Sequence, residues 1–254
     1  MRARTLRLGS VELPRIGLGT NRLTNTPENI AFLRAAVEHG VRMIDTAHLY
    51  AGGDSEKTIG AALAPFPDGL LVATKGGHGS AKPDVLRAEI EESLRRLRTD
   101  AIGLYYLHRV DSDTPIEESL AAIGEYHERD VVRLIGVSNV TVDQIERARQ
   151  VVPVAAVQNH FSLSERGHDE VVDYCAEQGI VFVPYFPLRA VDGPALREIA
   201  ERHEATTSQI ALAWLLARAR TTLPIPGTLS LEHLRENVGA LEIELSDDDL
   251  QTLG

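Results

Sequence analysis

Four side chains in the first half of the chain could together assist the reduction of a carbonyl group. They are Asp45, Tyr50, Lys75 and His108. An unperturbed tyrosine hydroxyl has a pKa of about 10, too high for easy proton donation at neutral pH, but a nearby cation favours the phenolate. Lys75 could be that cation, Asp45 could pair with its ammonium, and His108 could donate a hydrogen bond to a carbonyl oxygen. The set describes a proton donor beside an oxyanion site.

Taken singly, each of these residues has an ordinary structural explanation. His108 could be a satisfied histidine at a strand end, Lys75 could form a plain ion pair, and Tyr50 could be a packed loop aromatic. If the four side chains lie together, a shared catalytic role is favoured over these separate structural roles. Because no side chain donates hydride, carbonyl reduction would also require a nicotinamide cofactor.

The elements that must position these residues are short apolar runs alternating with helical patterns. Near-continuous apolar runs of this kind are typical of strands buried on both faces. The predicted strands are residues 15–20, 41–47, 70–75, 101–108, 132–139, 154–160, 180–188 and 222–227. Helices are predicted over residues 27–40, 83–97 and 115–130, each opening on a proline.

Alternating strands and helices imply parallel pairing, and about eight such units in 254 residues predict a closed (β/α)₈ TIM barrel. A doubly wound open sheet is the alternative. It is disfavoured because "GLGTNR" places Arg22 where the third glycine of the dinucleotide-binding fingerprint should stand.

Further elements flank the predicted barrel. Residues 6–14, "LRLGSVELP", predict an N-terminal β-hairpin that caps the bottom of the barrel. Residues 231–241 and 245–254 predict additional peripheral helices, the second with Ser246 as its N-cap. With no linker and no shift in composition, residues 1–254 are predicted to form a single domain.

Polar residues end the predicted strands. The carboxyl ends of barrel strands form the active face, so side chains that terminate successive apolar runs converge there. Asp45, Lys75 and His108 end the second, third and fourth runs. The fifth and sixth runs end in Ser138 and Asn139 and in Gln158 and Asn159.

Composition narrows the class of protein. The chain is 43% hydrophobic and 25% charged, and its net charge of −11 argues against nucleic acid or an anionic membrane as partner. The first ten residues hold no apolar leader, and no apolar run reaches the roughly 18 residues of a membrane span, so a cytoplasmic protein is expected. Cys175 is predicted to be a buried thiol, and the histidines show no metal-ligand spacing, so no metal site is predicted.

The motifs "DTAHLY", "VATK", "YYLHR", "IGVSN", "VQNHF", "VPYFPL" and "IPGTLSLEHLREN", in this order and spacing, resemble the aldo-keto reductase superfamily over nearly the whole chain. The second half is most similar to the bacterial pyridoxal reductase-like branch. The resemblance implies a TIM barrel, an NADPH lying extended across the C-terminal face, and a mechanism in which the cofactor binds first.

The resemblance also implies site residues. Tyr50 would be the general acid, Lys75 the partner that lowers the pKa of its hydroxyl, Asp45 the support for that lysine, and His108 the group that orients the carbonyl. The implied contacts with the nicotinamide end are Gly19, Thr20, Asn21, Ser138, Asn139, Gln158 and Tyr185. Those with the pyrophosphate are Phe186, Pro187, Leu188 and Arg189. Those with the adenosine end are Ile225, Gly227, Thr228, His233, Glu236 and Asn237.

Three of these positions depart from the family pattern. Phe186 replaces a frequent serine or cysteine, Gly227 a frequent lysine, and His233 an arginine that pairs with the 2′-phosphate. Because an imidazole is a weaker partner than a bidentate guanidinium, the preference for NADPH over NADH would be reduced. NADPH is the first choice, with NADH as the alternative.

The connections 109–115 and 189–195 are short for this superfamily. They predict an open pocket for a small carbonyl substrate, either tolerant of many aldehydes or completed by a neighbouring subunit of a homo-oligomer. Two other functions stay open: a cofactor-binding sensor on the same fold, and a class I aldolase with Lys75 as Schiff base. Pyridoxal as substrate is suggested only by the branch resemblance.

Overall fold

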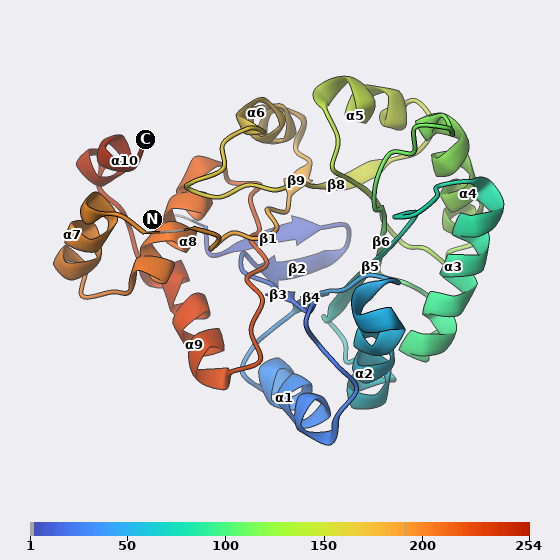
Figure 1. Ribbon diagram of the computed structural model, residues 1–254, viewed down its shortest axis with the longest axis horizontal. Helices are drawn as coiled ribbons and strands as arrows, with labels where there is room; N and C mark the ends of the chain where they lie inside the picture. The colour runs from blue at the N-terminus through green and yellow to red at the C-terminus, as the bar shows by residue number, and fades with distance from the viewer. Residues whose placement is uncertain (1–2, 191) are drawn as a thin grey trace.

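The computed structural model describes residues 3–190 and 192–254. Its main sheet contains parallel strands hydrogen-bonded in chain order, from β3 to β9. They curl into a ring with helices on the outside (Figure 1), as predicted for a (β/α)₈ barrel. The strands are β3 (Leu18–Gly19), β4 (Met43–Asp45), β5 (Leu71–Gly76), β6 (Leu104–Leu107), β7 (Ile135–Ser138), β8 (Val154–Gln158) and β9 (Val181–Phe182).

Helices connect these strands, and their starts follow local sequence signals. Proline stands in the first turn of α1 and α3, and threonine caps α5 and α8 with a reciprocal capping box. The predicted helix 83–97 is confirmed at both ends. The helices are α1 (Pro27–Glu38), α2 (Asp54–Leu63), α3 (Pro83–Leu97), α4 (Ile116–Glu128), α5 (Val142–Arg149), α6 (Asp169–Gln178), α7 (Pro194–Arg202), α8 (Thr207–Arg218), α9 (Leu231–Gly239) and α10 (Asp247–Leu253), with 3₁₀ turns η1 (Tyr50–Gly53) and η2 (Ala240–Glu242).

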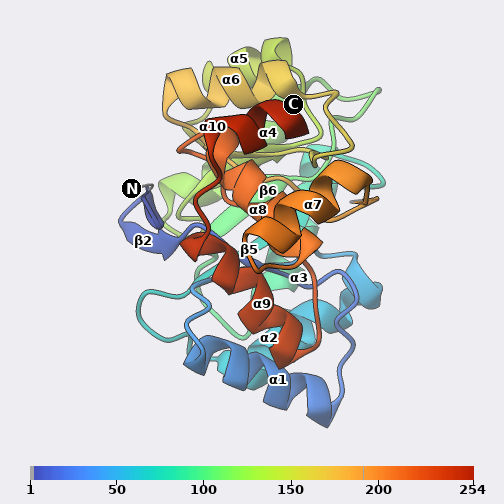
Figure 2. The same ribbon diagram turned by 90° about the vertical axis from the view of Figure 1, so that its left-hand side faces the viewer.

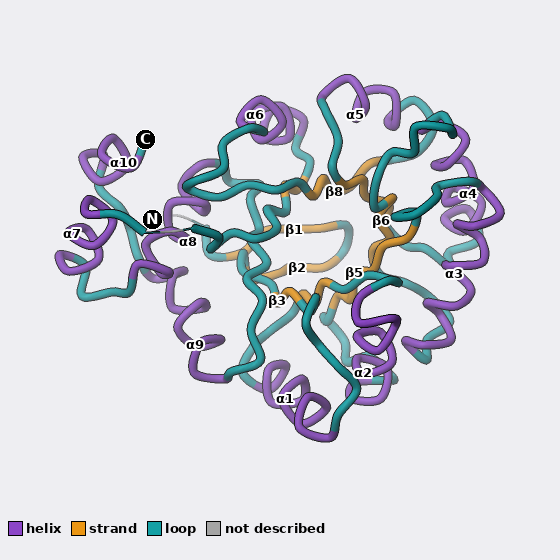
Figure 3. The backbone as a smooth tube through the Cα atoms, in the orientation of Figure 1, coloured by secondary structure: helices purple, strands orange, loops and turns teal. Residues whose placement is uncertain are grey.

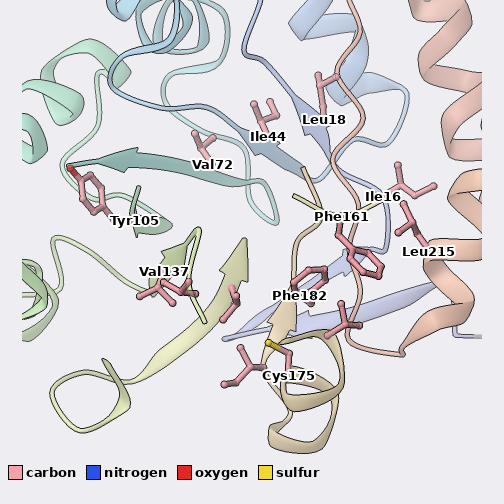
Figure 4. Packing of buried hydrophobic residues seen from close by; sticks show 14 of the residues in the cluster. Ile16, Leu18, Ile44, Val72, Tyr105, Val137, Phe161, Cys175, Phe182 and Leu215 are labelled. Atoms are coloured by element: carbon pink, nitrogen blue, oxygen red, sulfur yellow. The ribbon is translucent and has the colours of Figure 1, made fainter. Parts of the chain in front are cut away.

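Two apolar cores hold the barrel together. The outer core fills the space between strands and helices, where Phe161 stands edge-on to Phe182 (Figure 4). Phe161 also stacks on Trp214 of α8. Cys175 lies in this core, so the predicted buried thiol is confirmed, and burial raises the pKa of its thiol to about 12. The inner core fills the barrel itself, with Met43, Leu71, Leu104 and Tyr106 among its members.

The last predicted strand, 222–227, closes the barrel without being a regular strand. Leu223 donates to the carbonyl of Phe182 on β9, and Gly17 and Gly19 donate to the carbonyls of Pro224 and Pro226. Because the two prolines have no N–H, this segment accepts from the β3 side but cannot donate to it. It is therefore drawn as loop beside β3 in Figure 3, although it bridges both edges of the sheet.

The predicted strand 180–188 is correct only at its start. β9 ends at Phe182, and the chain then turns, with Phe186 and Ala190 in the left-handed region at φ 51° and φ 53°. Proline at 184 and 187 cannot donate to a ladder, so the apolar run continues as loop. This loop lies at the carboxyl end of β9, which is the face where the site residues gather.

The predicted N-terminal hairpin is present. β1 (Thr5–Leu8) and β2 (Val11–Pro14) pair antiparallel around Gly9 and Ser10. The side chains of Leu8 and Leu13 are buried in the inner core. The hairpin thus lies across the end of the barrel opposite the carboxyl ends of the strands, as seen within the ring in Figure 1 and at one end in Figure 2.

The two predicted helices after the barrel are α9 and α10. Ser246 caps α10 and accepts from the backbone N–H of Asp249, so the predicted N-cap is confirmed. Figure 1 shows α10 beside α7, outside the ring of strands. Within residues 3–190 and 192–254, no helix is both long and apolar enough to cross a membrane.

A buried arginine, which the sequence did not single out, joins the hairpin to the closing segment. Arg15 is 1% exposed. Its guanidinium donates to the carbonyls of Leu216 and Ala219 at the end of α8, and to that of Thr222 at the start of the closing segment. The carbonyls of Leu216 and Ala219 lie at the C-terminal end of α8, where helix carbonyls lose their helical partners, so Arg15 satisfies a buried helix end as well as the start of the closing segment.

We expect Arg15→Met to destabilise the protein by more than about 3 kcal/mol, because each buried acceptor left unsatisfied costs about 1–3 kcal/mol. Urea unfolding would measure the change. Arg7→Met, at an exposed position of the same hairpin, is the matched control and should stay within about 0.5 kcal/mol. Equal effects of the two substitutions would contradict this role for Arg15.

Candidate active site

A buried ion pair lies at the carboxyl ends of β4 and β5. The Nζ atom of Lys75 is 2.6 Å from Oδ1 of Asp45, and the two side chains are 1% and 2% exposed. Nζ also donates to the carbonyl of Thr46 at 2.7 Å, and Gln158 donates to the second carboxylate oxygen, Oδ2, at 2.8 Å. Both carboxylate oxygens of Asp45 are thus bound by side chains inside the protein.

The ion pair keeps Lys75 charged. Burial by itself lowers the pKa of Lys75, but the carboxylate of Asp45 outweighs burial, and the pKa of Lys75 lies above its usual value. A side chain that is 1% exposed therefore presents an ammonium, stabilised by its counter-ion, at the barrel mouth. Its Nζ atom is 5.0 Å from the ring centroid of Tyr50 and 5.9 Å from that of Tyr106.

Tyr50 reaches this ammonium from the loop after β4. It opens the turn η1, in which Ala51 and Gly52 are left-handed, with φ 49° and φ 63°. Its backbone N–H donates to the carbonyl of Ala47. The side chain is half-buried, with Leu49 beside it 40% exposed. Tyr50 therefore stands between the buried ion pair and solvent.

His108 stands at the end of β6 beside Tyr50. The two rings are 6.1 Å apart between centroids and meet edge-on, and the centroid of the His78 ring lies 5.0 Å from that of His108. Burial first, and then the charge of Lys75, lower the pKa of His108 to about 2. The imidazole is therefore neutral in the physiological range and carries a single N–H.

A second polar group lies next to His108, at the ends of β7 and β8. Asn139, in the left-handed region at φ 58°, donates to the carbonyl of His108 and to the hydroxyl of Ser138. Tyr185 donates its hydroxyl hydrogen to the Asn139 side-chain oxygen at 2.8 Å. Asn139, Ser138 and Tyr185 are thus brought together, whereas Gln158 is turned toward Asp45.

The loop after β9 forms an aromatic group. Tyr185 stacks on His160 at 5.3 Å, and Phe186 meets both rings edge-on. Phe186 is 45% exposed, and the guanidinium of Arg189 lies 5.8 Å above its ring. Pro187 is buried and Leu188 is half-buried in the same turn.

A cleft of about 360 Å³ lies between the end of β3 and the start of α9. No acidic side chain lines this cleft, although the chain has a net charge of −11. Several residues predicted for the cofactor line it, and Arg22, Leu23, Leu229 and Ser230 join them. Its lining residues are Gly19, Thr20, Asn21, Arg22, Leu23, Gly227, Thr228, Leu229, Ser230 and His233.

Other predicted cofactor residues lie around this cleft and make internal contacts. Thr20 is 3% exposed, and its hydroxyl donates to the carbonyl of Asp45. Glu236 accepts from the hydroxyl of Thr206, the N-cap of α8. Asn237 and Ile225 are each 5% exposed. In the part of the chain that the structure describes, no group of three or more His, Cys, Asp or Glu side chains could hold a metal ion.

Arg22 lines the cleft although it was not among the predicted cofactor contacts. In the sequence it stands out only by breaking the glycine fingerprint, yet in the structure it lines the same cleft as His233. The signal that could have found it was the missing arginine and lysine at 233 and 227, because a phosphate site that loses its cations needs another.

Comparison with known proteins extends the motif resemblance to the whole chain. The Aldo/keto reductase family model matches residues 15–191 and 192–254. An uncharacterized oxidoreductase of Schizosaccharomyces pombe is 38% identical over 268 residues, covering 97% of this chain and 87% of the relative. Pyridoxine 4-dehydrogenase of Escherichia coli is 34% identical over 280 residues, covering 100% of this chain and 98% of that protein.

Solved structures agree with the sequence relatives. The crystal structure of an aldo-keto reductase from Klebsiella pneumoniae in complex with NADPH superposes with a TM-score of 0.91 at 30% identity. It covers 100% of this chain and 94% of that chain. The resemblance seen in the motifs is confirmed, and the chain belongs to the aldo/keto reductase family.

Proposed function

We propose that this protein reduces an aldehyde or ketone to an alcohol, with a bound NADPH as hydride source and Tyr50 as proton donor. One observation carries the proposal: a charged, buried Lys75, paired with Asp45, lies 5.0 Å from the ring centroid of the half-buried Tyr50. An ammonium held in this position stabilises the phenolate that remains after proton transfer.

His108 contributes a neutral hydrogen-bond donor. Because its imidazole is uncharged, it donates one N–H to the carbonyl oxygen without competing with Tyr50 as an acid. The Tyr50 hydroxyl and the His108 N–H belong to neighbouring rings, whose centroids are 6.1 Å apart, so both could donate to an atom at a single position. A carbonyl oxygen placed there would accept from both, and negative charge developing on that oxygen would be neutralised by the Tyr50 proton.

The remaining residues fit a nicotinamide cofactor. When bound, the nicotinamide supplies the hydride. Asn139 and Ser138 offer polar atoms for its carboxamide, and the ring of Tyr185 offers a flat surface that would orient it. Gln158 already donates to Asp45, so its main role would be to hold the carboxylate that keeps Lys75 charged.

The cleft beside α9 suits the phosphate-bearing adenosine end. It is lined by Arg22, His233 and Thr228 and by no acidic side chain. Arg22 forms no hydrogen bond or ion pair with any residue that the structure describes, so its guanidinium is available to an incoming phosphate. In this proposal Arg22 supplies the cation that Gly227 and His233 do not, and NADPH is preferred over NADH.

The substrate we propose is pyridoxal or another small aromatic aldehyde. The similarity to pyridoxine 4-dehydrogenase favours pyridoxal. Exposed Leu49 and Phe186 flank Tyr50 and Tyr185 and would contact an apolar ring. A Schiff-base aldolase is disfavoured, since an ammonium kept charged by Asp45 is a poor nucleophile.

Replacing the general acid should abolish turnover and spare cofactor binding. We expect Tyr50→Phe to lower kcat at least about 100-fold with pyridoxal and 4-nitrobenzaldehyde, because general-acid catalysis contributes about 10²–10⁴-fold. NADPH oxidation gives the rate, and quenching of protein fluorescence gives NADPH affinity, which should not change. NADPH binding without turnover in the wild type would favour the sensor function instead.

Removing the carboxylate should destabilise the folded protein. Asp45→Asn leaves the buried ammonium of Lys75 without a counter-ion, and we expect a loss of about 3–5 kcal/mol in urea unfolding at pH 7. The variant's stability should then rise with pH, since its folded state binds fewer protons at Lys75 than its unfolded state. Asp84→Asn, in an exposed ion pair with Arg87, is the control. A pH-independent loss in the Asp45 variant would speak against a charged lysine.

Cofactor preference should depend on Arg22. We expect Arg22→Gln to weaken NADPH about 10-fold or more and NADH less than about 2-fold, since one charge-assisted contact is worth about 1.5–3 kcal/mol. Equilibrium titration with 2′,5′-ADP and 5′-AMP would separate the 2′-phosphate from the rest of the nucleotide. Arg235→Gln, on α9 but outside the cleft lining, is the control. If the substitution weakened 2′,5′-ADP and 5′-AMP equally, Arg22 would contact the pyrophosphate and not the 2′-phosphate.

A further inference from the structure

We propose that Arg96, on the outer helix α3, is a positioning residue for Tyr50: with buried Glu56 it holds the η1 loop at the distance from Lys75 that proton transfer needs. This inference rests on the proposed function, in which Tyr50 donates the proton. No motif quoted from the sequence includes Arg96, and the residue reaches the loop only because α3 packs against α2.

The guanidinium of Arg96 contacts the loop just before Tyr50. Its Nη1 atom donates to the carbonyl of His48 at 2.8 Å and lies 3.3 Å from Nδ1 of the same residue. Glu92, one turn earlier on α3, places its Oε1 atom 2.8 Å from Nη2 of Arg96 and so fixes the orientation of the guanidinium plane. The Arg96 side chain is 13% exposed, so solvent competes little for these contacts.

The same guanidinium contacts the loop just after Tyr50. A Cβ atom added to Gly53 would lie 2.3 Å from the guanidinium carbon of Arg96. Gly53 is left-handed at φ 93°, following Ala51 and Gly52 in the same region. The backbone around Tyr50 thus wraps closely around the guanidinium, and glycine is required at 53 both for this conformation and for this close approach.

Glu56 connects this loop to the strand that carries Lys75. Its side chain is fully buried, with one carboxylate oxygen 3.2 Å from Nη1 of Arg96. The other accepts from the hydroxyl of Thr74 at 2.6 Å, and Thr74 directly precedes Lys75 on β5. A single ion pair therefore joins both ends of the η1 loop to β5, which sets the separation of Tyr50 from the ammonium.

Lysine could not reproduce this arrangement. The guanidinium donates from two nitrogens in a rigid plane, and here it serves a carbonyl and two carboxylates at once. An ammonium at the same position would retain some charge compensation for Glu56 but would not fill the plane against Gly53. Arg96→Lys therefore tests positioning with less loss of stability than Arg96→Met.

The test compares Arg96→Lys and Arg96→Met with Arg87→Met, an arginine of the same helix in an exposed ion pair with Glu125. We expect both Arg96 variants to lower kcat about 10- to 100-fold, because small misplacements of a catalytic group cost this much. NADPH affinity should stay within about 2-fold, since the contacts of Arg96 lie away from the cleft. Arg87→Met should leave kcat and NADPH affinity unchanged.

A second readout does not require turnover. With 3-fluorotyrosine in place of Tyr50, the ¹⁹F resonance of the cofactor-free protein should shift in Arg96→Lys and not in Arg87→Met. An unchanged resonance in both Arg96 variants, or kcat within about 2-fold of wild type, would overturn the inference. If the wild type reduces no aldehyde, the proposed function fails, while the ¹⁹F result still decides whether Arg96 positions Tyr50.

Discussion

The structure depends on one buried ion pair. Lys75 and Asp45 lie on neighbouring parallel strands, both almost fully excluded from water, and neither could remain charged there alone. The pair is satisfied on every side: Thr46 accepts from the ammonium and Gln158 donates to the carboxylate. The barrel mouth is therefore organised around a buried cation held by its counter-ion, with the rings of Tyr50 and Tyr106 near its Nζ atom.

The mouth combines rigid and adjustable parts. Lys75 and Ser138 are held by the parallel ladder, and His108, just after β6, by a backbone hydrogen bond to Gly76. Tyr50 and Tyr185 come from loops, and a local interaction fixes each of them. The left-handed turn positions Tyr50, and a hydrogen bond to Asn139 positions Tyr185. Loops that carry reactive groups must be stiffened by contacts outside the site, which is the role we infer for Arg96.

The segment that closes the barrel is also held by contacts outside regular strand pairing. Pro224 and Pro226 cannot donate to β3, so on that side the last segment only accepts, from the N–H groups of Gly17 and Gly19, while Arg15 binds the carbonyl of Thr222 at its start. Irregular backbone at this seam also leaves room for the cleft between β3 and α9.

Local patterns in the sequence were enough to predict the strand–helix alternation, the hairpin, the helix starting at Pro83 and the N-cap at Ser246, since turn chemistry and apolar periodicity act over a few residues. They also predicted that Asp45, Lys75 and His108 would share one edge. Only the tertiary structure decided that Gln158 faces Asp45, that Arg22 enters the cleft, and that Arg96 reaches the Tyr50 loop. Those contacts join residues far apart in the chain. The partners of long side chains are set by packing and charge in the closed barrel, so local sequence patterns do not reveal them.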